Sequence, residues 1–65
     1  MKFNLGQRVR IIKDDKGLFK DEEGTIIEVE ENTYGIVFDN FNNPLFKGKD
    51  MKNIILYFKE DEIGE

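Results

Sequence analysis

The sequence predicts a small all-β barrel of five strands. Short stretches alternate apolar and polar residues, as a strand with one buried face does, and turn-forming residues separate them roughly every 8–12 residues. No segment has the 3.6-residue periodicity of a long helix. A closed barrel is favoured over an open sheet because closure removes the edges that so short a chain would otherwise leave exposed.

The first expected strand covers residues 7–13 (QRVRIIK). Its alternation places Val9 and Ile11 on one face and Arg8 and Arg10 on the other. Such a pattern is typical of a strand at the wall of a core, with its basic face toward solvent.

A loop and a hairpin are expected next. Residues 14–23 are mostly polar and predict a loop, and residues 24–31 (GTIIEVEE) predict a second strand with Ile27 and Val29 facing inward. Residues 34–38 (YGIVF) are β-branched or aromatic apart from one glycine, so they predict the third strand.

The last third of the chain contains one further clear strand. Residues 39–48 hold three asparagines and the only proline, which predicts a segment that begins as an irregular loop, with residues 45–47 as a short strand within it. Residues 54–58 (IILYF) are apolar on both faces, as a strand that closes a barrel would be, and residues 60–65 read as a loose acidic tail. The chain is therefore interpreted as one domain, residues 1–65, with its core over about residues 5–59.

The core has to stabilise this chain without covalent help. Sixty-five residues include no cysteine and no histidine, so disulfides and the commonest zinc sites are excluded. No metal or cofactor is expected. The residues expected to be buried lie on the inner side of the strands: Val9, Ile11, Ile27, Val29, Ile36, Phe38 and Leu56.

The charges are distributed unevenly along the chain. Residues 1–20 carry six cations and two acids, whereas residues 21–46 carry seven acids and no cation, and the whole chain has a net charge of −4. An acidic middle repels phosphate and fits a protein partner with a basic surface. No segment approaches the roughly 20 apolar residues of a membrane span. Together with the lack of cysteine, this leads us to expect a cytoplasmic protein.

Three segments resemble a KOW motif: residues 6–12 (GQRVRII), residues 17–19 (GLF) and residues 24–29 (GTIIEV). The version most similar to them is the C-terminal domain of NusG-type transcription elongation factors, and the resemblance covers about residues 5–38. It implies a five-stranded SH3-like barrel that docks on proteins or RNA through loops at one end. The chain departs from that family in lacking the proline of its Gly-Pro-Phe-like loop, and in being acidic where the RNA-binding members are basic.

The sequence argues against an enzyme. It contains no serine, cysteine or histidine, so the usual pairs of nucleophile and base cannot be assembled. Glu28 and Glu30 lie two residues apart on the outer face of one expected strand and enclose no pocket in which a carboxyl pKa could be tuned.

The leading prediction is a non-enzymatic protein-binding module that uses the loops at one end of the barrel and an acidic hairpin. Aromatic side chains in loops are frequent anchors for a partner. Phe41, flanked by two asparagines, is expected to be the exposed one. The residues predicted to bind the partner are Phe19, Tyr34, Asp39, Phe41, Glu28 and Glu30.

Two alternatives remain open at this point. A KOW-type domain that binds RNA or the ribosome would use Arg8, Arg10 and Lys13 on phosphate groups, although the two arginines could instead pair with Glu28 and Glu30 on a neighbouring strand. An acidic inhibitor would imitate a nucleic-acid backbone with the middle of the chain.

Overall fold

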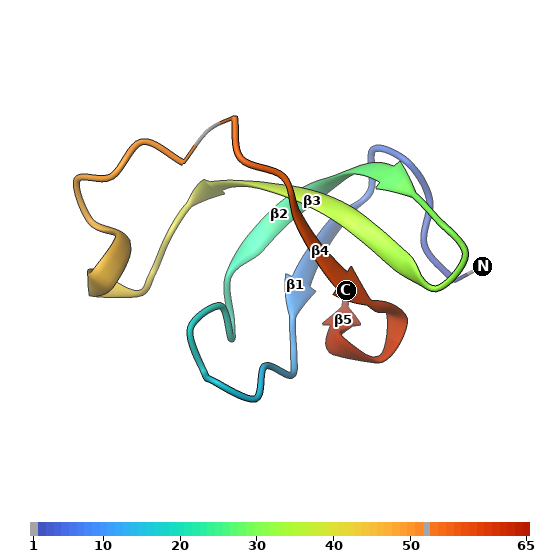
Figure 1. Ribbon diagram of the computed structural model, residues 1–65, viewed down its shortest axis with the longest axis horizontal. Coiled ribbons are helices and arrows are strands. Elements are labelled where there is room, and N and C mark those ends of the chain that lie inside the picture. Colours follow the sequence, from blue (N-terminus) through green and yellow to red (C-terminus); the bar gives the residue numbers. More distant parts are fainter. Residues whose placement is uncertain (1, 52) are drawn as a thin grey trace.

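The computed structural model describes residues 2–51 and 53–65, and only the main chain of residue 40. It contains five antiparallel strands and, among the described residues, no α-helix (Figure 1). None of the described residues belongs to a helix with the length and apolar character needed to cross a membrane. The elements are β1 (Arg8–Ile11), β2 (Glu23–Val29), β3 (Thr33–Asn40), the 3₁₀ helix η1 (Pro44–Phe46), β4 (Leu56–Lys59), the 3₁₀ helix η2 (Glu60–Glu62) and β5 (Ile63–Gly64).

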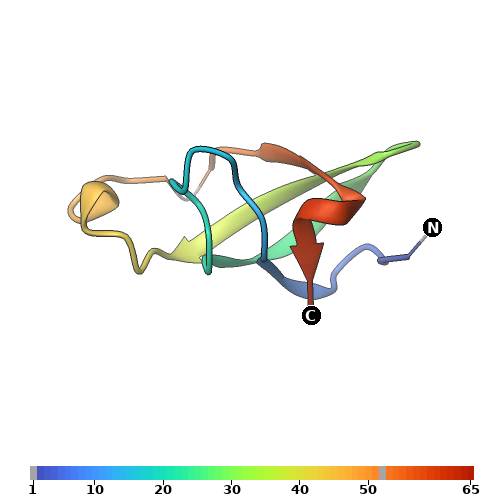
Figure 2. The same cartoon turned by 90° about the horizontal axis from the view of Figure 1, so that it is seen from below.

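All five strands belong to one sheet in the order β4-β3-β2-β1-β5. The last strand returns to the first, so β1 has β2 on one side and β5 on the other. Figure 2 shows the β2–β3 pair running diagonally, with β4 on one side of it and β1 on the other. The all-β prediction is confirmed. The short strand expected over residues 45–47 is not formed, because this part of the chain turns through η1, and the fifth strand is β5 instead. The sheet is not closed, because β4 and β5 remain its two edges.

The first strand matches its prediction. Val9 and Ile11 are buried, and Arg8 and Arg10 are exposed on the opposite face. Period-two alternation is sufficient here because β1 pairs regularly with both neighbours.

The prediction for the second strand was wrong by one residue at its centre. Ile26 is buried, whereas Ile27 is 41% exposed. The pairing passes from Ile26 opposite Ile36 to Glu28 opposite Gly35, so Ile27 is the extra residue of a β-bulge. A bulge shifts the alternation of inward and outward side chains by one residue. The pattern on one side of the bulge therefore does not predict which side chains face inward on the other side.

Two other residues of the expected core are only partly buried. Val29 and Leu56 pack against the edge of the core, while Ile36 and Phe38 on β3 are fully buried, as predicted. Gly24 lies on β2 at a point where β3 leaves no room for a side chain. A Cβ atom there would be 2.6 Å from the carbonyl oxygen of Val37, so only glycine fits without a shift of the strands.

The core also includes residues near both ends of the chain. Tyr34 is 1% exposed, and its hydroxyl accepts hydrogen bonds from the main-chain N–H groups of Lys2 (3.2 Å) and Phe3 (3.4 Å). The same hydroxyl donates to Glu60 Oε2 at 2.8 Å. The side chain of Phe3 is buried against the Tyr34 ring. One tyrosine on β3 therefore joins the N-terminal segment to η2.

The prediction of a loose tail over residues 60–65 was wrong. Ile63 is buried, and β5 pairs with β1 through Ile63 opposite Ile11 and Gly64 opposite Arg10. The apolar side chain of Ile63 fills the core beside β1 and so anchors an otherwise acidic segment.

Candidate functional site

Five phenylalanine rings meet at one end of the sheet, and we call them the phenylalanine cluster: Phe19, Phe38, Phe41, Phe46 and Phe58. The closest pair is Phe41 with Phe46, whose ring centroids are 4.7 Å apart, followed by Phe19 with Phe46 at 5.1 Å. The rings on β3 and β4 are buried, and the three rings from the loops are half-buried. The cluster therefore extends the core out to the surface.

The loop between β1 and β2 is shaped to bring Phe19 into this cluster. Asp14 Oδ2 accepts a hydrogen bond of 2.7 Å from the Phe19 main-chain N–H. Gly17 and Asp21 have positive φ angles, which reverse the chain on both sides of the ring. The result is a folded loop whose one aromatic side chain points back to the sheet.

Glu22 ties this loop to the segment that follows β3. It is the one buried charged side chain among the described residues, and its two oxygens accept hydrogen bonds from the main-chain N–H groups of Asn42 (2.7 Å) and Asn43 (2.8 Å). The Asn43 side-chain amide donates to the Leu18 carbonyl oxygen at 3.0 Å. These bonds hold both loops, and the rings they carry, in one arrangement.

Sequence reasoning missed Glu22 because it assigned the acidic run of residues 21–23 to a solvated loop. The sequence does contain an indication of its burial. Glu22, Gly24 and Ile26 are spaced two residues apart, as residues on one face of a strand are, and all three are buried. Extending the alternation of β2 toward its N-terminus would have placed Glu22 on the inner face.

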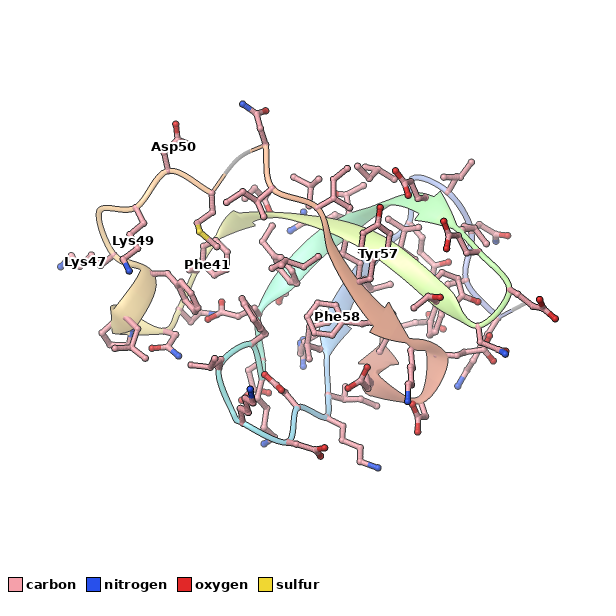
Figure 3. All side chains as sticks on the ribbon, in the orientation of Figure 1. Phe41, Lys47, Lys49, Asp50, Tyr57 and Phe58 are labelled. Atoms are coloured by element: carbon pink, nitrogen blue, oxygen red, sulfur yellow. The ribbon has the colours of Figure 1, made fainter. Side chains whose placement is uncertain are left out.

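A hollow of about 300 Å³ opens beside the cluster, between the end of β3 and residues 48–51. Its phenylalanine rings give it an apolar floor, and its rim carries charges of both signs. Figure 3 shows Phe41 within the arc that this segment makes and Lys47 projecting away from the arc. The lining residues are Phe38, Asp39, Phe41, Gly48, Lys49, Asp50 and Met51.

The structure brings together only some of the residues predicted to bind a partner. Asp39 and Phe41 line the hollow, and the Phe19 ring lies 6.4 Å from that of Phe41. Tyr34 is buried inside the sheet, so its assignment to the binding surface was wrong. Phe41 is half-buried against Phe38 and Phe46 instead of being fully exposed, because the next residue, Asn42, is hydrogen-bonded to Glu22 and Asp21.

The hairpin acids lie on a second surface. Tyr57 on β4 is 50% exposed and donates a hydrogen bond of 2.7 Å to Glu28 Oε1. This hydrogen bond is the main reason that the pKa of Tyr57 is raised, followed by partial desolvation and the negative charges of Glu28 and Glu30. Gly35 leaves room for the ring, since a Cβ atom there would be 3.1 Å from Tyr57 Cε1. In Figure 3 Tyr57 lies well apart from Phe41.

The N-terminal arginines pair with acids, although not with the two hairpin glutamates. Arg8 Nη1 lies 3.0 Å from Asp39 Oδ1, and both Arg8 and Arg10 lie within 4 Å of Glu23, at 3.8 and 3.7 Å. The register of β1 on β2 places Arg10 opposite Glu23, which explains the choice of partner. Lys13 is exposed beyond the end of β1. A phosphate group would therefore compete with carboxylates that already neutralise both arginines.

Comparisons with protein-family models, curated protein sequences and solved structures find no match to this chain. Within residues 2–51 and 53–65, no three acidic side chains are grouped closely enough to hold a metal ion.

Proposed function

We propose that this chain is a non-enzymatic protein-binding module, built as a KOW-like SH3-like barrel, and that a partner side chain occupies the hollow beside Phe41. The observation that supports this proposal is the hollow itself, which combines an aromatic floor with a charged rim. Sites that bind proteins and peptides commonly have an apolar centre surrounded by polar groups.

The barrel assignment is supported by the strand order. Consecutive strands from β1 to β4 are antiparallel neighbours, and β5 returns to β1. This connection adds β5 on the far side of β1, so a barrel is completed when the two edge strands, β4 and β5, approach each other. The core then lies between β4 and the β1–β5 end of the same folded sheet, where Phe58 and Ile63 are both buried.

The hollow is suited to recognition because its wall is held before a partner arrives. Glu22 fixes the segment after β3, and Phe41 is wedged between Phe38 and Phe46. A preorganised wall loses little conformational freedom on binding, so more of the contact energy appears as affinity. A half-buried aromatic ring at the centre of such a site is the usual position of a residue that dominates affinity.

The acidic hairpin contributes to the approach of the partner. Glu28 and Glu30 lie near each other beside Tyr57, and none of the ion pairs among the described residues involves them. Uncompensated surface charge raises the association rate of an oppositely charged protein. The proposed partner therefore also has a basic surface, at some distance from the side chain that enters the hollow.

Site-specific photo-crosslinking in the cell that expresses the protein tests this proposal. A photoreactive amino acid replaces Lys49, which lines the hollow, or Lys47, which is equally charged and exposed but does not. We expect a protein adduct from position 49 and little or none from position 47. Adducts of equal yield from both positions, or none from position 49, would contradict the proposal.

A further inference from the structure

The edge of the sheet at β4 has main-chain groups that point away from the fold. The direction follows from the hydrogen bonds of Ile26, whose N–H donates to the Gln7 carbonyl (3.0 Å) and whose carbonyl accepts from the Gly6 N–H (2.8 Å). The Ile26 main chain thus faces β1, and its antiparallel pair with Ile36 is not hydrogen-bonded. Ile36 must then face β4, where it lies opposite Leu56.

Because main-chain groups alternate along a strand, the N–H and C=O of Tyr57 point to the outer side of β4. Lys59 lies two residues further along the strand, so its main chain should point the same way as that of Tyr57. Its N–H does so, because it donates to Glu62 Oε1 at 2.8 Å instead of to β3. Among the backbone hydrogen bonds of the described loops and turns, none reaches Tyr57. Tyr57 therefore offers one donor and one acceptor at the sheet edge.

This edge has few of the features that usually prevent strand pairing: β4 is four residues long, and its one charged residue, Lys59, lies at its end. Residues 54–58 include no proline and no charged residue, and Ile54 and Tyr57 are 42% and 50% exposed. Natural sheet edges are protected by charges, prolines, bulges or short length, or else they are paired with another strand. The opposite edge, β5, is two residues long and is protected by that shortness.

We propose that β4 pairs with β4 of a second copy of this chain, antiparallel and about a two-fold axis at Tyr57. In this register Tyr57 faces the same residue of the second copy, and the two exchange a pair of N–H···O=C bonds. The next side chains along the strand place Lys59 opposite Ile55, so no like charges face each other despite the net charge of −4.

Two features favour a second copy over another extended segment as the partner of β4. No like charges lie opposite each other in this register, and a two-fold interface forms a closed dimer. The interface is the same patch on both copies, which ends the assembly at a dimer. The β5 edge is too short to continue the sheet on the other side. Since Lys59 N–H is already held by Glu62, the shared ladder is centred on the Tyr57 pair, and the dimer should dissociate on dilution.

Sedimentation equilibrium over a roughly hundredfold range of protein concentration tests the proposal. The expected result is a mass that rises from one chain to two. Tyr57→Pro removes the outward N–H and no main-chain bond inside the sheet, so it should fold and raise the dimer dissociation constant by about tenfold or more; like Tyr57→Val, it also loses the side-chain bond to Glu28. Tyr57→Val keeps the N–H and should remain within a few-fold of the wild type, which separates the main-chain bond from the ring. Leu56→Pro removes an N–H that faces β3, and it should unfold the chain.

A wild-type mass of one chain at every concentration would overturn the proposal, and so would a Tyr57→Pro variant that dimerises as strongly as Tyr57→Val. If circular dichroism shows that the proline variant is unfolded, Tyr57→Lys replaces it. This change puts like charges opposite each other across the axis and should also weaken the dimer by about tenfold. A folded Tyr57→Lys variant that dimerises as the wild type does would equally overturn it. The Lys49 variants, which change the hollow, should leave dimerisation unchanged.

Discussion

Replacing Glu22 by glutamine tests how the loop end of the sheet is held together. Both carboxylate oxygens of this fully buried side chain accept main-chain N–H groups, from Asn42 and Asn43. A carboxamide has only one acceptor oxygen, so one of these N–H groups would face an NH₂ group and lose its acceptor. Leaving a buried donor without a partner costs about 1–3 kcal/mol.

That loss is a large fraction of the stability of so small a domain, which is about 3–10 kcal/mol for a chain of this length. The melting temperature should fall by about 4–8 °C for each kcal/mol. Glu23→Gln is the matched control, because the adjacent carboxylate is exposed and its pairs with Arg8 and Arg10 contribute about 0–1 kcal/mol. Thermal and urea unfolding of both variants measures the two losses of stability. If Glu22→Gln melts at the temperature of Glu23→Gln, the carboxylate does not brace the two loops.

Three further predictions concern the core and the hairpin surface. Phe38→Ala removes a buried ring that contacts three others and should lower the free energy of unfolding by about 3–5 kcal/mol, so a variant that still melts cooperatively near the wild-type temperature would contradict the packing. The raised pKa of Tyr57 means that its hydrogen bond to Glu28 stabilises the fold at neutral pH and that this contribution is lost as the pH rises through the raised pKa. Glu28→Gln should return the pKa toward 10.0, as followed by NMR of the Tyr57 ring carbons, and an unchanged titration would exclude the hydrogen bond. Replacing Glu28, Glu30 and Glu31 together by glutamine should slow association with a basic partner and flatten its salt dependence in stopped-flow experiments, whereas an unchanged rate would leave these acids a role in solubility alone.

The strands could be predicted because their patterns are local. The alternation of residues 8–11 matches β1, and the β-branched and aromatic run after the turn matches the centre of β3. The bulge at Ile27 could not be predicted in this way, since an extra residue in one strand is determined by its pairing with the neighbour. The residues before it continue the same inward face, which is how Glu22 becomes buried.

The candidate site was harder to predict, because its residues are positioned by contacts between distant segments. Phe41 has the polar neighbours of an exposed loop residue, yet Glu22, about twenty positions earlier, draws the following segment onto the cluster. Tyr34 reads as a surface aromatic beside a turn, but its hydroxyl finds three partners from the two ends of the chain. Sequence patterns show which residues are apolar. They do not show which distant polar groups will form hydrogen bonds with one another.

The affinity of two charge-reversal variants for the partner found by crosslinking is the most direct test of the protein-binding proposal. Lys49→Glu alters the rim of the hollow, and Lys47→Glu makes the same change two residues away, outside it. Measured by calorimetry, the dissociation constant should change by about tenfold or more for Lys49→Glu and by less than about twofold for Lys47→Glu. Equal effects of the two substitutions, or no effect of either, would show that the partner does not occupy the hollow beside Phe41.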